Sequence, residues 1–166
     1  MWRQKNSINC VVIVIFFMMA IHVSAGEVVK PQIDLNGQYK AISWIYSTRG
    51  EQIDKEKDLD LTLVFRKNKF FLNTLMYEVD NTVHILAGTS SDKYKAFWTD
   101  GGYKLVIEIY VAEDGTYKLD GGGNPVKSVS SFYFSKDEKQ LFWETLFPNG
   151  MLVTRKYEKV VSSKDL

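Results

Sequence analysis

The chain has very little cysteine, very little histidine and almost no net charge. Its 166 residues include one cysteine and two histidines, and the formal net charge is +1. One cysteine excludes a disulfide within the chain, and so few cysteines and histidines argue against an ordinary zinc or haem site. The balanced charge lacks the basic excess of a nucleic-acid-binding surface. We therefore expect no metal, no cofactor and no nucleic-acid partner.

Long hydrophobic runs are absent after the first 25 residues. Arg3 and Lys5 precede an apolar segment that ends in Val23-Ser24-Ala25, an arrangement typical of a secretory signal peptide. The segment is shorter than the roughly 20 apolar residues that a membrane-spanning helix needs. We therefore expect a secreted or periplasmic protein with no membrane span in its mature form. The predicted division is a signal peptide (1–25), a leader (26–36), one domain (37–160) and a polar tail (161–166).

The predicted domain consists of short apolar segments that alternate with turn residues. Aromatic residues make up 14% of the chain, and such residues are enriched in strands. Lys67-Asn68 and Asn149-Gly150 are typical of tight hairpin turns. No segment has helical periodicity, and residues 49–60 are so highly charged that we expect a loop there. Strands are predicted at 37–46, 59–66, 69–79, 82–88, 93–99, 103–111, 116–119, 126–135, 140–147 and 150–160.

Nearly all of the predicted connections are short. Short connections favour an up-and-down antiparallel meander over a Greek-key sandwich, and closure into a barrel protects the edge strands. The sequence therefore predicts an all-β fold, a single antiparallel up-and-down β-barrel of 8–10 strands. A barrel of this size encloses its own side chains or one small ligand.

Two segments, residues 35–43 and 137–160, resemble the two ends of the barrels of the calycin superfamily, which includes the lipocalin-like and fatty-acid-binding-protein-like barrels. Residues 137–160, which contain Thr-Arg-x-Tyr-Glu-Lys, resemble the final hairpin of the fatty-acid-binding proteins. Residues 35–43 resemble the Gly-x-Trp first strand of the lipocalins, with Tyr39 in place of tryptophan. The resemblance implies that Arg155 and Tyr157 occupy the two positions that bind a fatty-acid carboxylate.

Arg155 has three possible roles. Alternation along its strand places Arg155 and Tyr157 inside the barrel, where an unpaired charge is unfavourable. The guanidinium could bind a ligand carboxylate together with the Tyr157 hydroxyl. The resemblance to lipocalins implies instead a barrel-closing role, with Gly37 and Tyr39 at the first strand and Arg155 stacked on Tyr39. An internal ion pair with Glu144 or Glu108 is the third possibility.

These features favour a binding protein. We expect an exported lipocalin-like barrel that binds a small hydrophobic or amphipathic, fatty-acid-like ligand. The alternative is a non-catalytic structural or protein-interaction module whose barrel is filled by side chains. An enzyme is the least favoured class, because His84 has no catalytic motif around it and is interpreted as a packing residue. Residues 120–125 are interpreted as a hairpin tip.

Overall fold

The computed structural model describes residues 29–48, 51–55, 60–89, 91–113 and 116–160, and this part of the chain is almost entirely β-structure. No helix in these ranges has the length and apolar character needed to cross a membrane. The predicted signal peptide and polar tail lie outside the described residues. The strands are β1 (Gly37–Thr48), β2 (Glu51–Lys55), β3 (Leu61–Arg66), β4 (Lys69–Leu72), β5 (Leu75–Glu78), β6 (Val83–Ile85), β7 (Lys93–Thr99), β8 (Lys104–Tyr110), β9 (Ala112–Glu113), β10 (Thr116–Tyr117), β11 (Lys127–Phe134), β12 (Gln140–Leu146) and β13 (Leu152–Lys159), with a short 3₁₀ turn, η1 (Asp100–Gly102), before β8.

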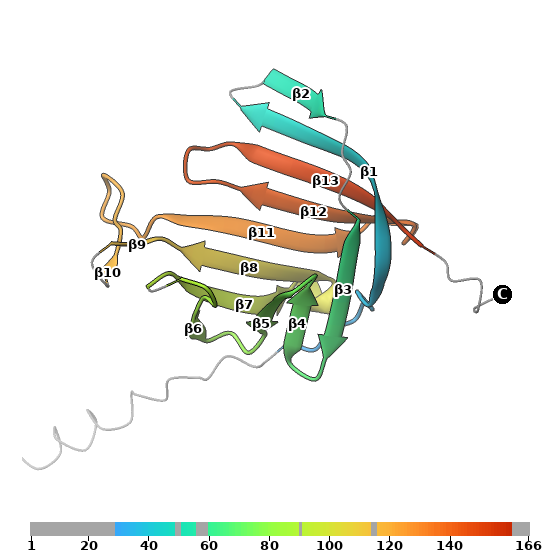
Figure 1. Cartoon of the computed structure of the whole chain (residues 1–166), viewed down its shortest axis with the longest axis horizontal. Coiled ribbons are helices and arrows are strands. Elements are labelled where there is room, and N and C mark those ends of the chain that lie inside the picture. Colours follow the sequence, from blue (N-terminus) through green and yellow to red (C-terminus); the bar gives the residue numbers. More distant parts are fainter. Residues whose placement is uncertain (1–28, 49–50, 56–59, 90, 114–115, 161–166) are drawn as a thin grey trace, which may run out of the picture.

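The main sheet is an antiparallel up-and-down meander that nearly closes into a barrel, as the sequence predicts. Its strand order is β5-β4-β3-β1-β13-β12-β11-β8-β7-β6, and β2 pairs with β1 outside this path (Figure 1). Most neighbours in the sheet are consecutive in the chain, because short turns join them. The small hairpin β9–β10 stands apart from this sheet, between β8 and β11.

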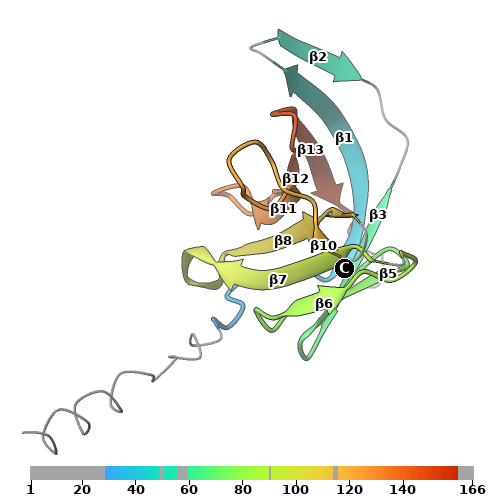
Figure 2. The same cartoon turned by 90° about the vertical axis from the view of Figure 1, so that its left-hand side faces the viewer.

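The first and last strands close one side of the barrel. Tyr39 of β1 pairs with Lys159 of β13 on one side and with Leu61 of β3 on the other. The register between β1 and β13 shifts between Ala41 and Ser43, which marks a β-bulge. Figure 2 shows β1 as a long, strongly curved strand that runs from β3 to β2. Bulges bend a strand in this way.

The opposite side, between β5 and β7, is held by few contacts, and we call it the seam. It contains one parallel bridge, Val79 to Ala96, and a hydrogen bond from the Asn81 amide to the Ala96 carbonyl at 3.0 Å. The Tyr94 hydroxyl also accepts a hydrogen bond from the Glu78 backbone amide at 2.9 Å. Because this side lacks a full ladder among the described residues, these bonds carry the closure.

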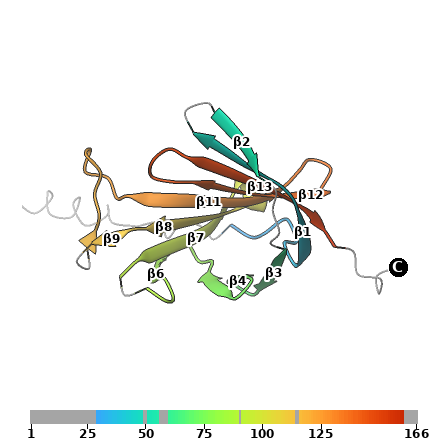
Figure 3. The ribbon, with the colours of Figure 1, turned by 45° about the horizontal axis from the view of Figure 1, so that its top comes forward.

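The core lies where the sheet folds over itself. Figure 3 shows β11, β8 and β7 side by side, with β3 and β4 below them. Phe70 of β4 and Phe132 of β11 are fully buried and meet edge to face, with ring centroids 5.2 Å apart. Leu35, which precedes β1, is also buried in this cluster. Its backbone carbonyl accepts a hydrogen bond from the Tyr39 hydroxyl at 2.9 Å. The N-terminal leader thus covers one end of the barrel interior.

Two segments differ from the sequence-based prediction. The single strand predicted at 69–79 is two strands, because Asn73 adopts a φ of 52° and exchanges two hydrogen bonds with the Thr62 backbone. Asparagine tolerates this left-handed conformation, so it makes a tight turn. The loop predicted at 49–60 contains strand β2, which pairs with β1. Pairing with a neighbouring strand overrides the weak strand propensity of a charged segment.

A row of leucines tests how burial determines stability. Leu63, Leu72 and Leu75 are cross-strand neighbours on β3, β4 and β5, but Leu63 is 0% exposed and Leu75 is 45% exposed. We expect Leu63→Ala to lower the free energy of unfolding by about 2–5 kcal/mol, because it opens a cavity. Leu75→Ala should change it by less than ~1 kcal/mol. Urea denaturation measures both, and equal losses would contradict this burial pattern.

Candidate functional site

The site is a row of cross-strand neighbours across six strands, which we call the tryptophan row. Arg155 of β13 lies directly between Trp143 of β12 and Trp44 of β1. On the far side of Trp143, the row continues through Phe132 and Leu105 to Trp98 of β7. Directly opposed side chains in a sheet lie within contact distance. The strand register therefore places one arginine between two indole rings.

Arg155 is stacked between these two rings. Its guanidinium carbon lies 4.5 Å from the Trp44 ring centroid and 4.2 Å from that of Trp143. The side chain is only 9% exposed. Burial lowers the pKa of the guanidinium, while the nearby hydroxyls of Tyr157 and Tyr46 oppose this change. Arginine remains protonated at neutral pH, so the row holds a buried positive charge.

The guanidinium has few hydrogen-bond acceptors among the described residues. Nη1 donates to Thr145 Oγ1 at 3.1 Å, while Nε is buried with no partner among the described residues. The indole N–H groups of Trp44, Trp98 and Trp143 are also buried without a partner there, although that of Trp44 lies close enough to the Tyr157 hydroxyl to affect its pKa. Buried polar groups are usually satisfied. This row is therefore rich in donors and poor in acceptors.

The ion pair with Glu144 or Glu108, the third possible role of Arg155, is not formed. Within the described part of the chain, no carboxylate lies within 4.0 Å of its guanidinium. Glu108 bonds to Lys127 and Tyr110, and Glu144 accepts from Thr154 at 3.5 Å. Both glutamates fall between inward-facing neighbours on their strands, so alternation directs them to the outer face.

Small polar side chains lie next to the tryptophan row, towards the β12–β13 turn. This second row, the small-residue row, places Ser130, Thr145 and Val153 on three adjacent strands. Ser130 Oγ and Thr145 Oγ1 are 3.0 Å apart. Arg155 donates towards this row, through Thr145. On β11 and β12 the inner face thus changes from the rings of Phe132 and Trp143 to the hydroxyls of Ser130 and Thr145, while Tyr46 of β1 lies beyond Val153.

Tyr157 lies two residues further along β13, on the same inner face as Arg155, as predicted. It is 1% exposed and pairs with Leu141 and Ala41. Burial raises the pKa of Tyr157 to about 12, although the positive charge of Arg155 and the indole of Trp44 act in the opposite direction. The phenol is therefore neutral at physiological pH and keeps its proton as a donor.

The ring stacked on Arg155 differs from the expected one. Tyr39 instead packs near Phe134, with centroids 6.4 Å apart, while Trp44 stacks on Arg155. Strict alternation from Tyr39 would place residue 44 on the outer face. The bulge between Ala41 and Ser43 adds one residue, so Tyr39 and Trp44 both reach the interior. No simple sequence pattern announces this bulge, so alternation does not identify Trp44 as a partner of Arg155. The pairing of Trp143 with Arg155 depends on the register between β12 and β13.

Gly37 lies at the start of β1, opposite Leu63. Its φ of +152° is rarely adopted by residues with a side chain, and a Cβ there would lie 2.8 Å from Lys159 Cε. The end of the Lys159 side chain can move, so the backbone conformation is the stronger reason for glycine at this position. The structure places Gly37 and Tyr39 at the end of β1 that pairs with β3, and Tyr39 also pairs with β13.

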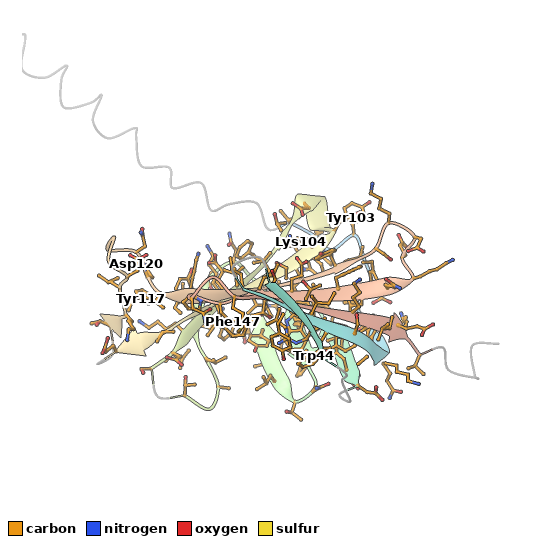
Figure 4. All side chains as sticks on the ribbon, turned by 90° about the horizontal axis from the view of Figure 1, so that it is seen from above. Trp44, Tyr103, Lys104, Tyr117, Asp120 and Phe147 are labelled. Carbon is orange, nitrogen blue, oxygen red and sulfur yellow. The ribbon has the colours of Figure 1, made fainter. Side chains whose placement is uncertain are left out.

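Two other predicted features lie away from the tryptophan row. The Asp120 carboxylate accepts hydrogen bonds from the backbone amides of Gly122 and Asn124 at 2.8 and 2.9 Å, so it organises the hairpin tip. Figure 4 shows Asp120 and Tyr117 at one end of the molecule, apart from Trp44. His84 packs on the Tyr94 ring, with centroids 5.3 Å apart.

Comparisons with known proteins were made for the whole chain. No protein-family model matches it, and no curated protein matches it. Among solved structures, the chain is similar to isotype 1 transferrin binding protein B from serogroup B Neisseria meningitidis, with a TM-score of 0.36 and 15% identity. The match covers 79% of this chain and 28% of that chain, so the chain spans less than a third of that structure.

The buried tyrosines predict loss of stability at high pH. Burial raises the pKa of Tyr39 and Tyr157 from 10.0 to about 12. Because the unfolded chain ionises first, the free energy of unfolding should be unaffected by these groups below pH 10 and should fall as the pH rises from 10 through 12. Urea denaturation across this range, with Tyr157→Phe for comparison, measures the effect. A slope that Tyr157→Phe leaves unchanged would contradict a contribution from Tyr157.

The Thr145 hydroxyl is expected to stabilise the buried arginine. Thr145→Val keeps the shape but removes the acceptor for Arg155 Nη1 and the partner of Ser130. We expect the free energy of unfolding to fall by about 1–3 kcal/mol. Thr154→Val, on the outer face of β13, is the matched control and should change it by less than ~1 kcal/mol. Equal effects of the two substitutions would contradict this role.

Proposed function

We propose that this chain is a non-catalytic, exported binding protein whose barrel takes up a small amphipathic acid, such as a fatty acid. Its carboxylate would lie against Arg155, and its apolar part would contact the rings of the barrel interior. The observation that carries the proposal is the buried guanidinium between Trp44 and Trp143, with one hydroxyl acceptor among the described residues.

A carboxylate suits this position chemically. It offers two acceptor oxygens, and the planar guanidinium of Arg155 binds such a group through charge-assisted hydrogen bonds. Tyr157 is a neutral phenol on the same inner face and would add a donor. The ligand would thus supply the acceptors that the tryptophan row lacks, and it would balance the buried charge.

The shape of the inner face supports the same occupant. In the small-residue row, Ser130, Thr145 and Val153 have smaller side chains than the rings beside them, and Tyr46 of β1 continues the row beyond Val153. Aromatic rings and aliphatic side chains line the rest of the inner face, which suits an apolar chain. A ligand that enters beside the small-residue row would reach Arg155 from the side of Thr145.

A second candidate function is a protein-interaction module that uses the outer face. Tyr133 and Phe142 stack there with centroids 5.3 Å apart, and Lys104 and Lys156 lie over their rings at 5.3 and 5.8 Å. Three more lysines lie over aromatic rings, in the pairs Lys93–Tyr117, Lys95–Phe97 and Lys127–Tyr110. These rings are partly exposed, and aromatic residues are enriched in protein interfaces, although lysine is depleted there. In this alternative, Arg155 only closes the barrel.

Binding of dodecanoate and of dodecanol to the purified chain distinguishes the two candidates. We expect dodecanoate to bind more tightly than dodecanol, and Arg155→Met to weaken dodecanoate at least tenfold while it leaves dodecanol unchanged. The reason is that methionine keeps the side-chain stem but removes the charge. Isothermal titration calorimetry measures each affinity. Arg66→Met, at an exposed arginine of β3, is the matched control and should bind as the unchanged chain does.

Two results would overturn the proposal. Absence of dodecanoate binding by the unchanged chain would leave the interaction module as the better candidate, as would equal affinities for the acid and the alcohol. If Arg155→Met does not fold, Arg155→Lys keeps the charge without the planar fork. We then expect Arg155→Lys to bind dodecanoate more weakly than the unchanged chain does. Arg155→Lys should still bind dodecanoate more tightly than it binds dodecanol.

A further inference from the structure

A cluster of polar side chains lies at the seam, on the opposite side of the barrel from the β1–β13 closure. Glu78 ends β5, Asp80 lies in the following turn, and His84 is the central residue of β6. One potential ligand atom from each lies within 4.8 Å of the other two. Figure 2 shows β5, β6 and β7 close together at this place.

Three atoms of the cluster form a compact triangle. Asp80 Oδ1 lies 2.8 Å from Thr82 Oγ1 and 2.9 Å from His84 Nε2, and the last two atoms are 2.9 Å apart. With a neutral imidazole, Thr82 and His84 offer at most two protons for these three contacts. Atoms bound to one zinc ion at about 2.1 Å lie roughly 3.0–3.4 Å apart, so small shifts would let an ion replace the shared protons.

The protein holds both ends of this cluster through one residue, Tyr94 of β7. Its hydroxyl accepts the backbone amide of Glu78 at 2.9 Å, and its ring stacks on the His84 ring with an interplanar angle of 27°. These contacts fix the backbone at Glu78 and the plane of the His84 ring. Tyr94 is itself buried, so the positions of Glu78 and His84 are coupled to the core.

We propose that Glu78, Asp80 and His84 bind a divalent transition-metal ion of the zinc class. An imidazole nitrogen with two carboxylates suits zinc, whereas magnesium and calcium prefer all-oxygen sites. Thr82 or a water molecule completes the coordination. The bound ion would join the end of β5 to β6 and so strengthen the seam, where few bonds close the barrel. The sequence alone made a metal site improbable because the domain has a single histidine.

One charge competes with the ion. Lys69 Nζ lies 3.7 Å from Glu78 Oε1, in a pair whose side chains are 47% and 34% exposed. An exposed pair of this kind contributes little free energy, so the ammonium group can move away when the ion binds. Removal of this lysine should therefore strengthen binding, an effect that a purely structural cluster would not produce.

Zinc titration of the chelator-treated chain by isothermal calorimetry tests the site. We expect one zinc ion per chain, bound with a micromolar dissociation constant and more tightly than magnesium. His84→Gln and Asp80→Asn should each weaken binding at least tenfold, and Lys69→Met should strengthen it. Asp137→Asn is the matched control, because Asp137 also accepts hydrogen bonds in a tight turn, from Ser135 and Lys139, but lies between β11 and β12.

Two further measurements identify the ligands. Zinc should shift the imidazole nitrogen resonances of His84, and it should raise the melting temperature of the unchanged chain but not that of His84→Gln. Equal zinc binding by His84→Gln would place the ion elsewhere and overturn the proposal, as would no binding at millimolar zinc. The result is independent of the dodecanoate experiment, because the two sites lie on different strands.

Discussion

The buried charge of Arg155 is the constraint on which the barrel interior depends. A guanidinium in this position is unfavourable unless rings, hydroxyls or an anion surround it. The chain supplies two indole rings, from Trp44 and Trp143, and one hydroxyl from Thr145. These partners meet the guanidinium only when β12, β13 and β1 are in register. Closure of this side of the barrel and accommodation of the charge therefore depend on the same strand pairing. The missing acceptors then define what a ligand would have to provide.

The two sides of the barrel are closed in different ways. β1 and β13 pair along most of their length, whereas the seam rests on the bridge from Val79 to Ala96 and on bonds made by Asn81 and Tyr94. Local opening is easiest where few backbone bonds must break. A ligand at the tryptophan row and an ion at the seam would therefore act on separate parts of the fold, one on the strongly paired side and one on the weakly paired side.

Much of the fold could be predicted from local pattern, but part of the site could not. Alternation correctly places Arg155 and Tyr157 on the inner face, because successive side chains in a strand point to opposite faces of the sheet. The turn at Lys67-Asn68 was also predicted, and Lys67 has the positive φ that such turns use. The turn at Asn73 and strand β2 are not predicted. Asn73 is held by hydrogen bonds to Thr62 on another strand. The charged segment of β2 has weak strand propensity and forms a strand only through its hairpin with β1.

The sequence by itself determined an all-β meander, most of its turns and the inward direction of Arg155, because these follow from side-chain alternation and local turn chemistry. Only the tertiary structure decided which groups meet the arginine. A single inserted residue at the β1 bulge brings Trp44 inside together with Tyr39, and the pairing of β12 with β13 adds Trp143. The same holds at the seam, where packing against Tyr94 of β7 orients the ends of the segment that contains Glu78, Asp80 and His84. Register and packing are properties of several strands together, so no single segment contains them.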